Sequence, residues 1–220
     1  MKASWLASAV LMAATATGAT AATTSFDSVG EFSGTQGQGG WSYGYYSRAG
    51  DASSFTTMAV FGPGFEYGSN QSGPTWWEGA PQNPWTALFS EGGHPSLQSG
   101  DHWAVRRWVS GAPGTLSISG DYQGMLFGTA AVHVLIDGVE RFAAVANPNL
   151  MTFGLADLAV SQGSTIDFAI SAYDGSQHGD VIRFTATGEL LPTAVPEPAS
   201  AALLLAGGLA GAAVRRRRTR

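Results

Sequence analysis

The sequence predicts an all-β fold built as a single β-sandwich, and three observations carry this prediction. Thr, Ser, Val and aromatic residues are plentiful and the 220 residues include 30 glycines, which is typical of turn-rich β domains. Apolar and polar residues alternate with period two through the second half of the chain. No stretch of the body carries an apolar stripe with the 3.6-residue period of a helix.

The first 22 residues are predicted to be a secretory signal peptide. Lys2 supplies the positive start, residues 5–14 are apolar, and residues 19–22 offer small side chains for signal peptidase, with cleavage expected near Ala21 or Ala22. A structural amphipathic helix is a poor alternative, because residues 3–22 contain no charge. We therefore expect export, with the folded domain at residues 23–192.

The exported body is acidic. Residues 23–192 contain five arginines, no lysine and fifteen Asp or Glu. Such a surface argues against nucleic acid and anionic lipid as partners and is compatible with neutral sugars or cations. The chain has no cysteine, which excludes a thiolate zinc site and a cysteine nucleophile and leaves the fold to rely on its core.

The expected strands follow from the alternation. In chain order they are 55–61, 102–109, 114–119, 131–136, 139–145, 151–160, 165–170 and 181–187. Inward-facing residues are expected at Leu116, Ile118, Ile166, Phe168, Ile170, Ile182, Phe184 and Ala186. Asp137-Gly138 predicts a type I′ hairpin, and Gly154 suggests a bulge. Residues 34–46 and 62–84 are predicted to be long loops.

Four features of the second half resemble the jelly-roll sandwich domains of exported bacterial proteins, including carbohydrate-binding modules. They are the Trp-Val-Arg strand near residue 103, the segments 113–120 and 132–138, and the two closing strands. The resemblance implies a jelly-roll-like β-sandwich and leaves the ligand open.

Two aromatic segments form the candidate glycan site. Their rings are Trp41, Tyr43 and Tyr45 (with Tyr46) in the first segment and Trp76, Trp77 and Trp85 in the second. Sugar rings stack on indole and phenol faces, while Glu66, Glu78, Gln82 and Asn83 are candidates to bond the hydroxyls. The alternative is that these rings cover the open ends of the sandwich, since large aromatics dominate protein cores.

No metal or cofactor is predicted. The four histidines, at 94, 102, 133 and 178, form no zinc-binding spacing, and His133 is expected to be structural. The loop with Asp174 and Asp180 offers oxygen ligands for calcium, but two carboxylates are too few to assign a site. A solvated hairpin loop is the simpler interpretation.

No catalytic residue is predicted. The chain has no Gly-x-Ser-x-Gly pentapeptide, phosphate-binding loop or dinucleotide fingerprint. Fifteen acids allow many carboxylate pairs, so a small glycan-active hydrolase stays open as an alternative. Arg106 and Arg107 are adjacent on a strand and face opposite sides; the inward one is expected to pair with a carboxylate such as Asp121 or Asp167.

The C-terminal residues 193–220 combine three features in a fixed order. Val195-Pro196-Glu197-Pro198 comes first, then the uncharged run 199–214, then Arg215, Arg216, Arg217 and Arg218. As a helix the run is roughly 24 Å long, short for a hydrocarbon core of about 30 Å, and the arginines stay on the cytoplasmic side. This order resembles the PEP-CTERM sorting signal of Gram-negative bacteria, read by exosortase and often found alongside exopolysaccharide production.

The resemblance implies exosortase and signal peptidase as processing partners, and a membrane anchor that precedes surface or extracellular release. The leading hypothesis is therefore a non-catalytic exported surface or matrix protein associated with exopolysaccharide or biofilm. The alternatives are a carbohydrate-binding module that uses the aromatic loops and a small secreted glycan-active enzyme. Exposed coplanar tryptophans would favour binding, and tryptophans packed inward would favour a scaffold.

Overall fold

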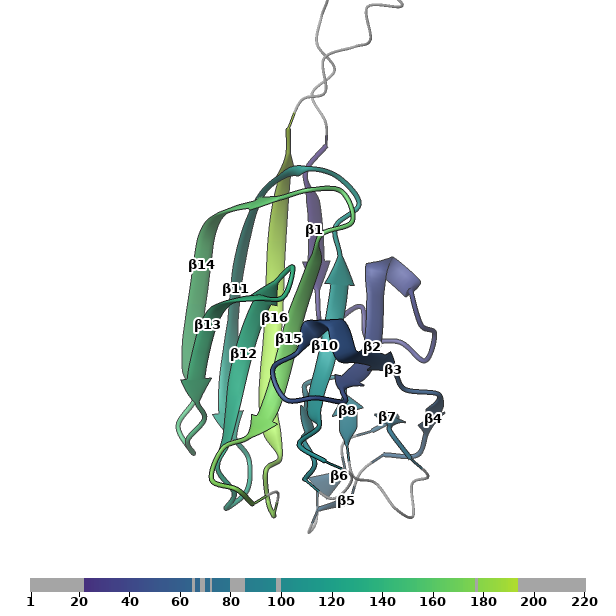
Figure 1. Cartoon of the computed structure of the whole chain (residues 1–220), viewed down its shortest axis with the longest axis vertical. Helices are drawn as coiled ribbons and strands as arrows, with labels where there is room; N and C mark the ends of the chain where they lie inside the picture. Colours follow the sequence, from purple (N-terminus) through teal and green to yellow (C-terminus); the bar gives the residue numbers. More distant parts are fainter. Residues whose placement is uncertain are drawn as a thin grey trace, which may run out of the picture. The chain divides into compact units, whose positions relative to one another are not determined.

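The fold is known from a computed structural model that describes residues 22–64, 66–67, 70–71, 73–79, 86–97, 100–176 and 178–193, with only the backbone at 66–67 and 70–71. Residues Ala22–Thr193 form one compact unit. Two antiparallel sheets make up the two layers of this unit (Figure 1). The expected signal peptide and the sorting segment at 194–220 lie outside the described residues.

The first sheet has eight strands, in the order β14-β11-β16-β9-β8-β7-β4 with β1 beside β16. Its strands are β1 (Thr24–Asp27), β4 (Val60–Gly62), β7 (Thr75–Trp77), β8 (Ala87–Phe89), β9 (Gly92–His94), β11 (Gly114–Gly124), β14 (Met151–Val160) and β16 (Ile182–Pro192). The long strands β11, β14 and β16 form one half of this sheet, and short strands form the other (Figure 1).

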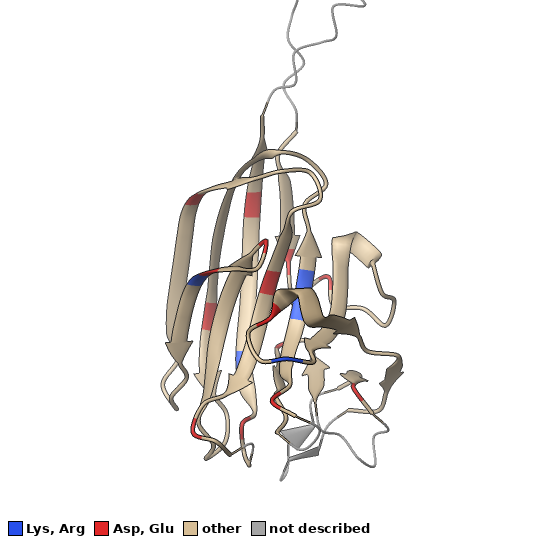
Figure 2. Cartoon of the chain, viewed as in Figure 1, with Lys and Arg blue, Asp and Glu red and all other residues tan. Residues whose placement is uncertain are grey.

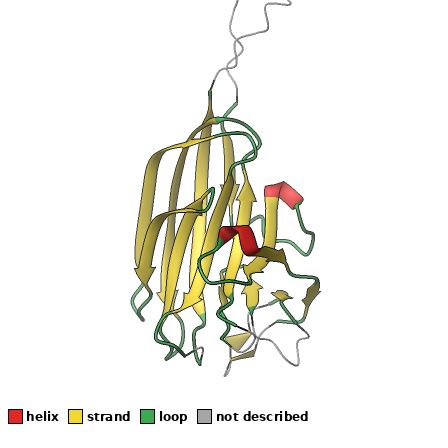
Figure 3. Cartoon of the chain, viewed as in Figure 1, coloured by secondary structure: helices red, strands yellow, loops and turns green. Residues whose placement is uncertain are grey.

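The second sheet has six strands, in the order β13-β12-β15-β10-β2-β3. Its strands are β2 (Trp41–Tyr46), β3 (Phe55–Thr57), β10 (Trp103–Val109), β12 (Ala130–Ile136), β13 (Val139–Val145) and β15 (Thr165–Ala172). A small third sheet pairs β5 (Glu66–Tyr67) with β6 (Asn70–Gln71), and two 3₁₀ turns, η1 (Gln38–Gly40) and η2 (Ala52–Ser54), are the helical elements of the described chain (Figure 3).

The all-β sandwich predicted from the sequence is therefore confirmed. Every residue expected to face inward on the 114–119, 165–170 and 181–187 strands belongs to the core. The Asp137-Gly138 turn has the two positive φ angles, 50° and 77°, of the expected type I′ hairpin. Among the described residues, no helix is long and apolar enough to cross a membrane.

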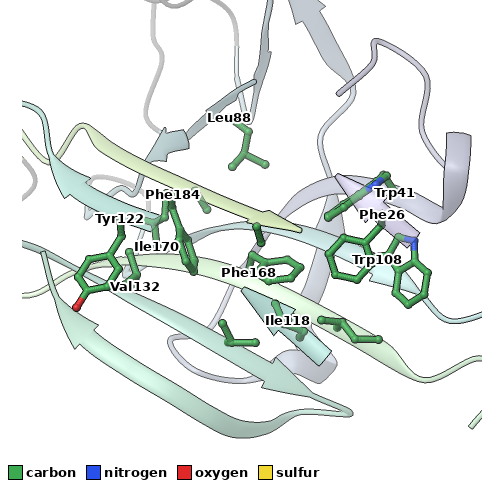
Figure 4. Packing of buried hydrophobic residues seen from close by; sticks show 14 of the residues in the cluster. Phe26, Trp41, Leu88, Trp108, Ile118, Tyr122, Val132, Phe168, Ile170 and Phe184 are labelled. Carbon is green, nitrogen blue, oxygen red and sulfur yellow. The ribbon is translucent and has the colours of Figure 1, made fainter. Parts of the chain in front are cut away.

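The core between the sheets is aromatic. Phe26 on β1 packs its ring 4.8 Å from Trp108 and 5.5 Å from Trp41, and Phe168 lies 6.0 Å from Phe184, centroid to centroid (Figure 4). Gly188 on β16 makes room for this arrangement, because a Cβ there would overlap the Phe26 ring. Large rings thus fill the space between the sheets, where the described chain has no helix.

The first half of the chain differs from the expectation in three places. Residues 55–61 form two strands, not one: β3 belongs to the six-stranded sheet and β4 to the eight-stranded sheet, so the chain crosses between the layers at Met58, which is buried. Residues 41–46 of the first predicted loop are strand β2, and residues 75–77 of the second are strand β7.

The expected bulge is in the right strand but at a different residue. Gly154 pairs regularly with Ser119, whereas the register shifts between Leu116, opposite Leu158, and Ile118, opposite Leu155. Asp157 takes up the irregularity with a φ of 56°. An aspartate tolerates the left-handed region better than most side chains, so glycine was the wrong signal here.

Candidate functional site

Most rings of the predicted glycan site lie inside the domain. Trp41, Tyr43, Trp76 and Trp77 are between 1% and 4% exposed. Tyr43 and Trp76 stack with centroids 5.8 Å apart. Their polar groups are also bound internally, since Trp41 Nε1 donates to Glu31 Oε2 at 2.7 Å and Trp76 Nε1 to the Ser33 carbonyl at 2.8 Å. In this structure these four side chains are part of the packed interior and are not on the surface.

Among the candidate rings whose side chains the structure describes, Tyr45 is the one that is partly exposed to solvent. Its ring stacks on His102 at 5.0 Å, and His102 Nδ1 lies 2.8 Å from Glu78 Oε1. Thr86 Oγ1 donates to the other oxygen of Glu78. Burial, and then the charge of Glu78, raise the pKa of Tyr45. Trp85, like Glu66, Gln82 and Asn83, has no described side chain, so glycan binding by the predicted set stays a prediction.

Arg106 corrects one expectation about charge. It is the inward arginine of the pair, 1% exposed, yet none of the described carboxylates binds it. Its guanidinium donates to three backbone carbonyls, those of Ser90 at 2.9 Å, Ser28 at 3.4 Å and Phe184. Burial lowers its pKa to about 10, so it stays protonated at neutral pH. Backbone carbonyls as the partners of this arginine could not be predicted from the sequence pattern.

The carboxylate expected for the inward arginine is bound by the other one. Arg107 donates to Asp167 through Nε at 2.7 Å and Nη2 at 2.8 Å, and Tyr46 Oη donates to the same carboxylate at 2.5 Å. The guanidinium also lies 4.0 Å above the Phe55 ring. Asp121 instead accepts from Arg183. These charges are therefore paired within the domain.

One hydrogen-bonded array has the order of a serine-hydrolase triad. Ser171 Oγ lies 3.0 Å from His133 Nε2, and His133 Nδ1 lies 2.7 Å from Glu140 Oε2. However, Ser171 is 4% exposed and the Trp103 indole stacks on the imidazole at 4.2 Å. A substrate carbonyl has no path to the serine, so we assign the array a structural role, as the sequence predicted for His133.

The two most exposed aromatics, Phe127 and Tyr173, lie elsewhere, at the end of the sandwich formed by three loops. We call these the distal loops: residues 125–129, 146–150 and the described residues of 173–181. Phe127 is 84% exposed, Tyr173 61% and Leu150 57%. β16 runs from Ile182 at this end, where it pairs with Gly124, to Pro192 at the end where the described chain terminates. Figure 1 shows both ends of the described chain at the opposite pole of the sandwich.

Backbone hydrogen bonds join the distal loops into one unit. The amide of Gly124, the last residue of β11 before the first loop, donates to the carbonyl of Asn147 in the second loop at 2.8 Å. Three further bonds link the first loop to the third. They run from Met125 to Val181 at 2.9 Å, from Gly128 to Gly179 at 3.2 Å and from Tyr173 to Thr129 at 3.1 Å. The exposed rings therefore stand on an ordered base.

Asp180 is buried inside this base. Asp180 is 0% exposed, and neither of its carboxylate oxygens has a hydrogen-bond partner among the described residues. Burial, followed by the negative charge of Asp174, raises its pKa to about 7, and the nearby Thr129 amide offsets part of this. The carboxylate lies against Gly128, where a Cβ would overlap it. Such an unpaired buried acid is costly when ionised.

The charges of the described domain do not gather into a metal site. Acids are spread over both sheets and loops, and few arginines stand among them (Figure 2). No group of three or more His, Cys, Asp or Glu side chains is placed to hold a metal ion in the described part of the chain. Asp174 and Asp180, the two carboxylates considered above as calcium ligands, are the pair for which cation binding can be tested.

Comparison with known proteins finds two likenesses. Residues 194–218 match the model of the PEP-CTERM protein-sorting motif. No curated protein matches the chain in sequence. Solved structures with a similar arrangement include the CBM36-1 domain of a multidomain xylanase from the hindgut metagenome of Trinervitermes trinervoides, at 11% identity and TM-score 0.33, covering 68% of this chain and 95% of that one.

Two further structures are similar to the same extent. A carbohydrate-binding module CBM36 in complex with calcium and xylotriose has 12% identity and TM-score 0.32, covering 75% of this chain and 97% of that one. A CBM35 from Paenibacillus barcinonensis has 11% identity and TM-score 0.31, covering 74% and 97%. At such low identity and TM-score, neither their ligands nor their sites transfer to this chain.

Proposed function

We propose that this protein is a non-catalytic component of the cell surface or extracellular matrix, sorted by exosortase and associated with exopolysaccharide or biofilm. The match of residues 194–218 to the PEP-CTERM protein-sorting motif carries the proposal. The motif indicates export, with anchoring at the C-terminus before processing. Within it, residues 195–198 form the Pro-Glu-Pro signature and residues 215–218 the arginine stop.

The path to the surface has two processing steps. Signal peptidase removes residues 1–22, and the apolar run 199–214 then holds the chain in the inner membrane with Arg215–Arg218 on the cytoplasmic side. Exosortase acts near the motif and releases or transfers the domain at residues 23–192. The acidic charge of that domain supports a partner that is neither nucleic acid nor anionic lipid.

A structural or binding role agrees with the described side chains. The buried tryptophans support the scaffold interpretation, and the covered Ser171 argues against a serine nucleophile in the Ser171–His133–Glu140 array. The alternatives are a carbohydrate-binding module that uses its aromatic loops and a small secreted glycan-active enzyme. No cofactor is proposed, and calcium is left to the test of Asp180 described below.

Fractionation of the native host tests the sorting. Wild-type cells are compared with a variant carrying Pro196→Ala, Glu197→Ala and Pro198→Ala, and with Thr193→Ala as a control outside the signature. We expect wild type and control at the surface or in the medium, and the motif variant in the inner membrane. Identical distributions of all three proteins would overturn exosortase sorting.

Co-sedimentation with the exopolysaccharide of the same host tests the association. We expect the mature protein to sediment with the polymer, while an acidic protein of similar size does not. A protein that stays in the supernatant would contradict the association. Release of reducing sugar during the incubation would instead support the glycan-active enzyme.

A further inference from the structure

We propose that the distal loops are the polysaccharide contact surface of this protein, with the rings of Phe127 and Tyr173 as a platform for neutral sugar residues. This inference rests on the proposed function and assigns it to a place that the sequence did not indicate. Pyranose rings present apolar C–H faces, which pack on exposed aromatic faces, while their hydroxyls need polar neighbours.

The exposure of these two rings needs an explanation because most described aromatic side chains of the domain are buried or partly buried. Phe127 is 84% exposed and Tyr173 61%, whereas Trp41, Tyr43 and Tyr46 are at most 1% exposed. Burial of a phenylalanine side chain stabilises a fold, and Phe127 forgoes nearly all of that stabilisation. Leu150, at 57%, adds a third apolar side chain from the neighbouring loop. Exposed apolar clusters of this kind mark interaction sites.

The platform is held in place before any ligand arrives. A Cβ on Gly179 would lie 2.9 Å from the Phe127 ring, and the φ of this glycine is 83°, so only a residue without a side chain suits the position. Gly128, next to Phe127, donates its amide to the Gly179 carbonyl. Holding a ring in its binding orientation reduces the entropy lost on association.

Charge and polarity select the class of ligand. None of residues 125–129, 146–150 and 173–181 is a lysine or arginine, so the surface has no cation to attract phosphate, sulfate or uronate groups. The exposed side chains of Asn149, Asp174 and His178 lie in the same loops and can bond hydroxyls. A neutral polysaccharide fits both features, whereas an anionic polymer finds no lysine or arginine in these loops to pair with its charges.

The position of the surface suits a sorted protein. β16 separates Ile182, at the distal loops, from Pro192 by ten residues, or about 33 Å of extended strand. The motif match begins two residues after Pro192. The distal loops therefore face away from the end of the domain that leads to the sorting signal, and a partner reaches them without meeting that end.

Affinity electrophoresis of the mature protein from its native host tests the inference. The gels contain dextran, hydroxyethylcellulose, galactomannan, the host exopolysaccharide or anionic alginate. Phe127→Ala and Tyr173→Ala are compared with Tyr173→Phe, which keeps the ring, and with Leu191→Ala, which removes an equally exposed apolar side chain (58%) at the opposite end. Thermal unfolding confirms that each variant folds.

We expect at least one neutral polymer or the host exopolysaccharide to retard the wild type. Each alanine variant in the distal loops should weaken this binding about tenfold or more, while Tyr173→Phe and Leu191→Ala bind as wild type does. Retarded wild type with unaffected distal variants would overturn the inference and leave the proposed association standing. Stronger retardation by alginate would contradict the neutral class, and absence of binding to every polymer would overturn both.

The same protein preparation also tests whether a second copy of the chain, and not a polysaccharide, binds the distal loops. Sedimentation equilibrium of the wild type is expected to give the monomer mass at all concentrations. A dimer that Phe127→Ala dissociates would assign the surface to self-association and overturn the polysaccharide inference.

Discussion

Asp180 is expected to make the stability of the domain depend on pH. Its carboxylate is buried and has no hydrogen-bond partner in the described part of the chain, and its pKa in the folded state is raised to about 7. In the unfolded chain the same group has an ordinary pKa of about 3.9. Between these two values the folded protein holds a proton that the unfolded chain has released, so the free energy of unfolding falls as the pH rises.

The size of the effect follows from this interval. About three pH units at 1.36 kcal/mol each give about 4 kcal/mol, present below pH 4 and lost by the time the pH exceeds about 7. Asp180→Asn keeps the shape of the side chain and cannot ionise. We therefore expect the variant to match the wild type within about 1 kcal/mol at pH 4 and to be more stable by up to about 4 kcal/mol at pH 8.

The free energy of unfolding of both proteins is measured by urea titration at pH 4, 5, 6, 7 and 8. EDTA is present so that no divalent cation binds the carboxylate. Asp174→Asn serves as the matched control, because Asp174 is exposed and contributes the smaller part of the pKa shift. A constant difference between wild type and Asp180→Asn at every pH would refute the reasoning. Calcium that restores the wild type at pH 8, but not the variant, would assign the carboxylate to a cation.

Two further predictions concern the core. Arg106→Met should lower the free energy of unfolding in urea by about 2–4 kcal/mol, because the carbonyls of Ser28, Ser90 and Phe184 lose their donor. Arg141→Met, at an exposed arginine, is the control. Equal stability of the two variants would contradict the role of Arg106. Gly188→Ala should cost about 2 kcal/mol or more, because the new methyl group would overlap Phe26. Its control is Gly154→Ala, where no atom lies within 4 Å of the added Cβ; similar thermal midpoints for the two alanine variants would refute the packing argument.

The second half of the fold could be predicted from sequence because its strands have one face in the core and one in solvent. Leu116 and Ile118 are buried between exposed Thr115, Ser117 and Ser119, and this alternation is visible without a structure. The short strands β7 and β8 are buried at every residue. Such strands show no period, so 75–77 had the pattern of a loop.

The candidate site was harder to predict, because its residues are scattered in the sequence. Phe127 and Tyr173 are single aromatics in separate short loops, and hydrogen bonds such as that from Tyr173 to Thr129 bring the loops together. The dense aromatic segments drew the prediction instead, and Trp41 and Trp76 turned out to be buried. A cluster of rings along a chain indicates apolar surface, and only the fold decides which side of the domain it covers.

The prediction of which charges pair was wrong for a related reason. The inward arginine was expected to need a carboxylate, and Asp167 was a correct partner for the wrong arginine. Arg106 is satisfied by backbone carbonyls, which every residue carries and no sequence pattern distinguishes.

Intact-mass spectrometry of the mature protein from its native host tests the central claim, exosortase sorting of a β-sandwich, most directly. The account predicts a wild-type chain that lacks residues 1–22 and ends near the Pro196-Glu197-Pro198 signature, and a signature variant that retains the tail. A mature wild-type chain that still carries Arg215–Arg218 would contradict it and leave a plain membrane anchor in its place.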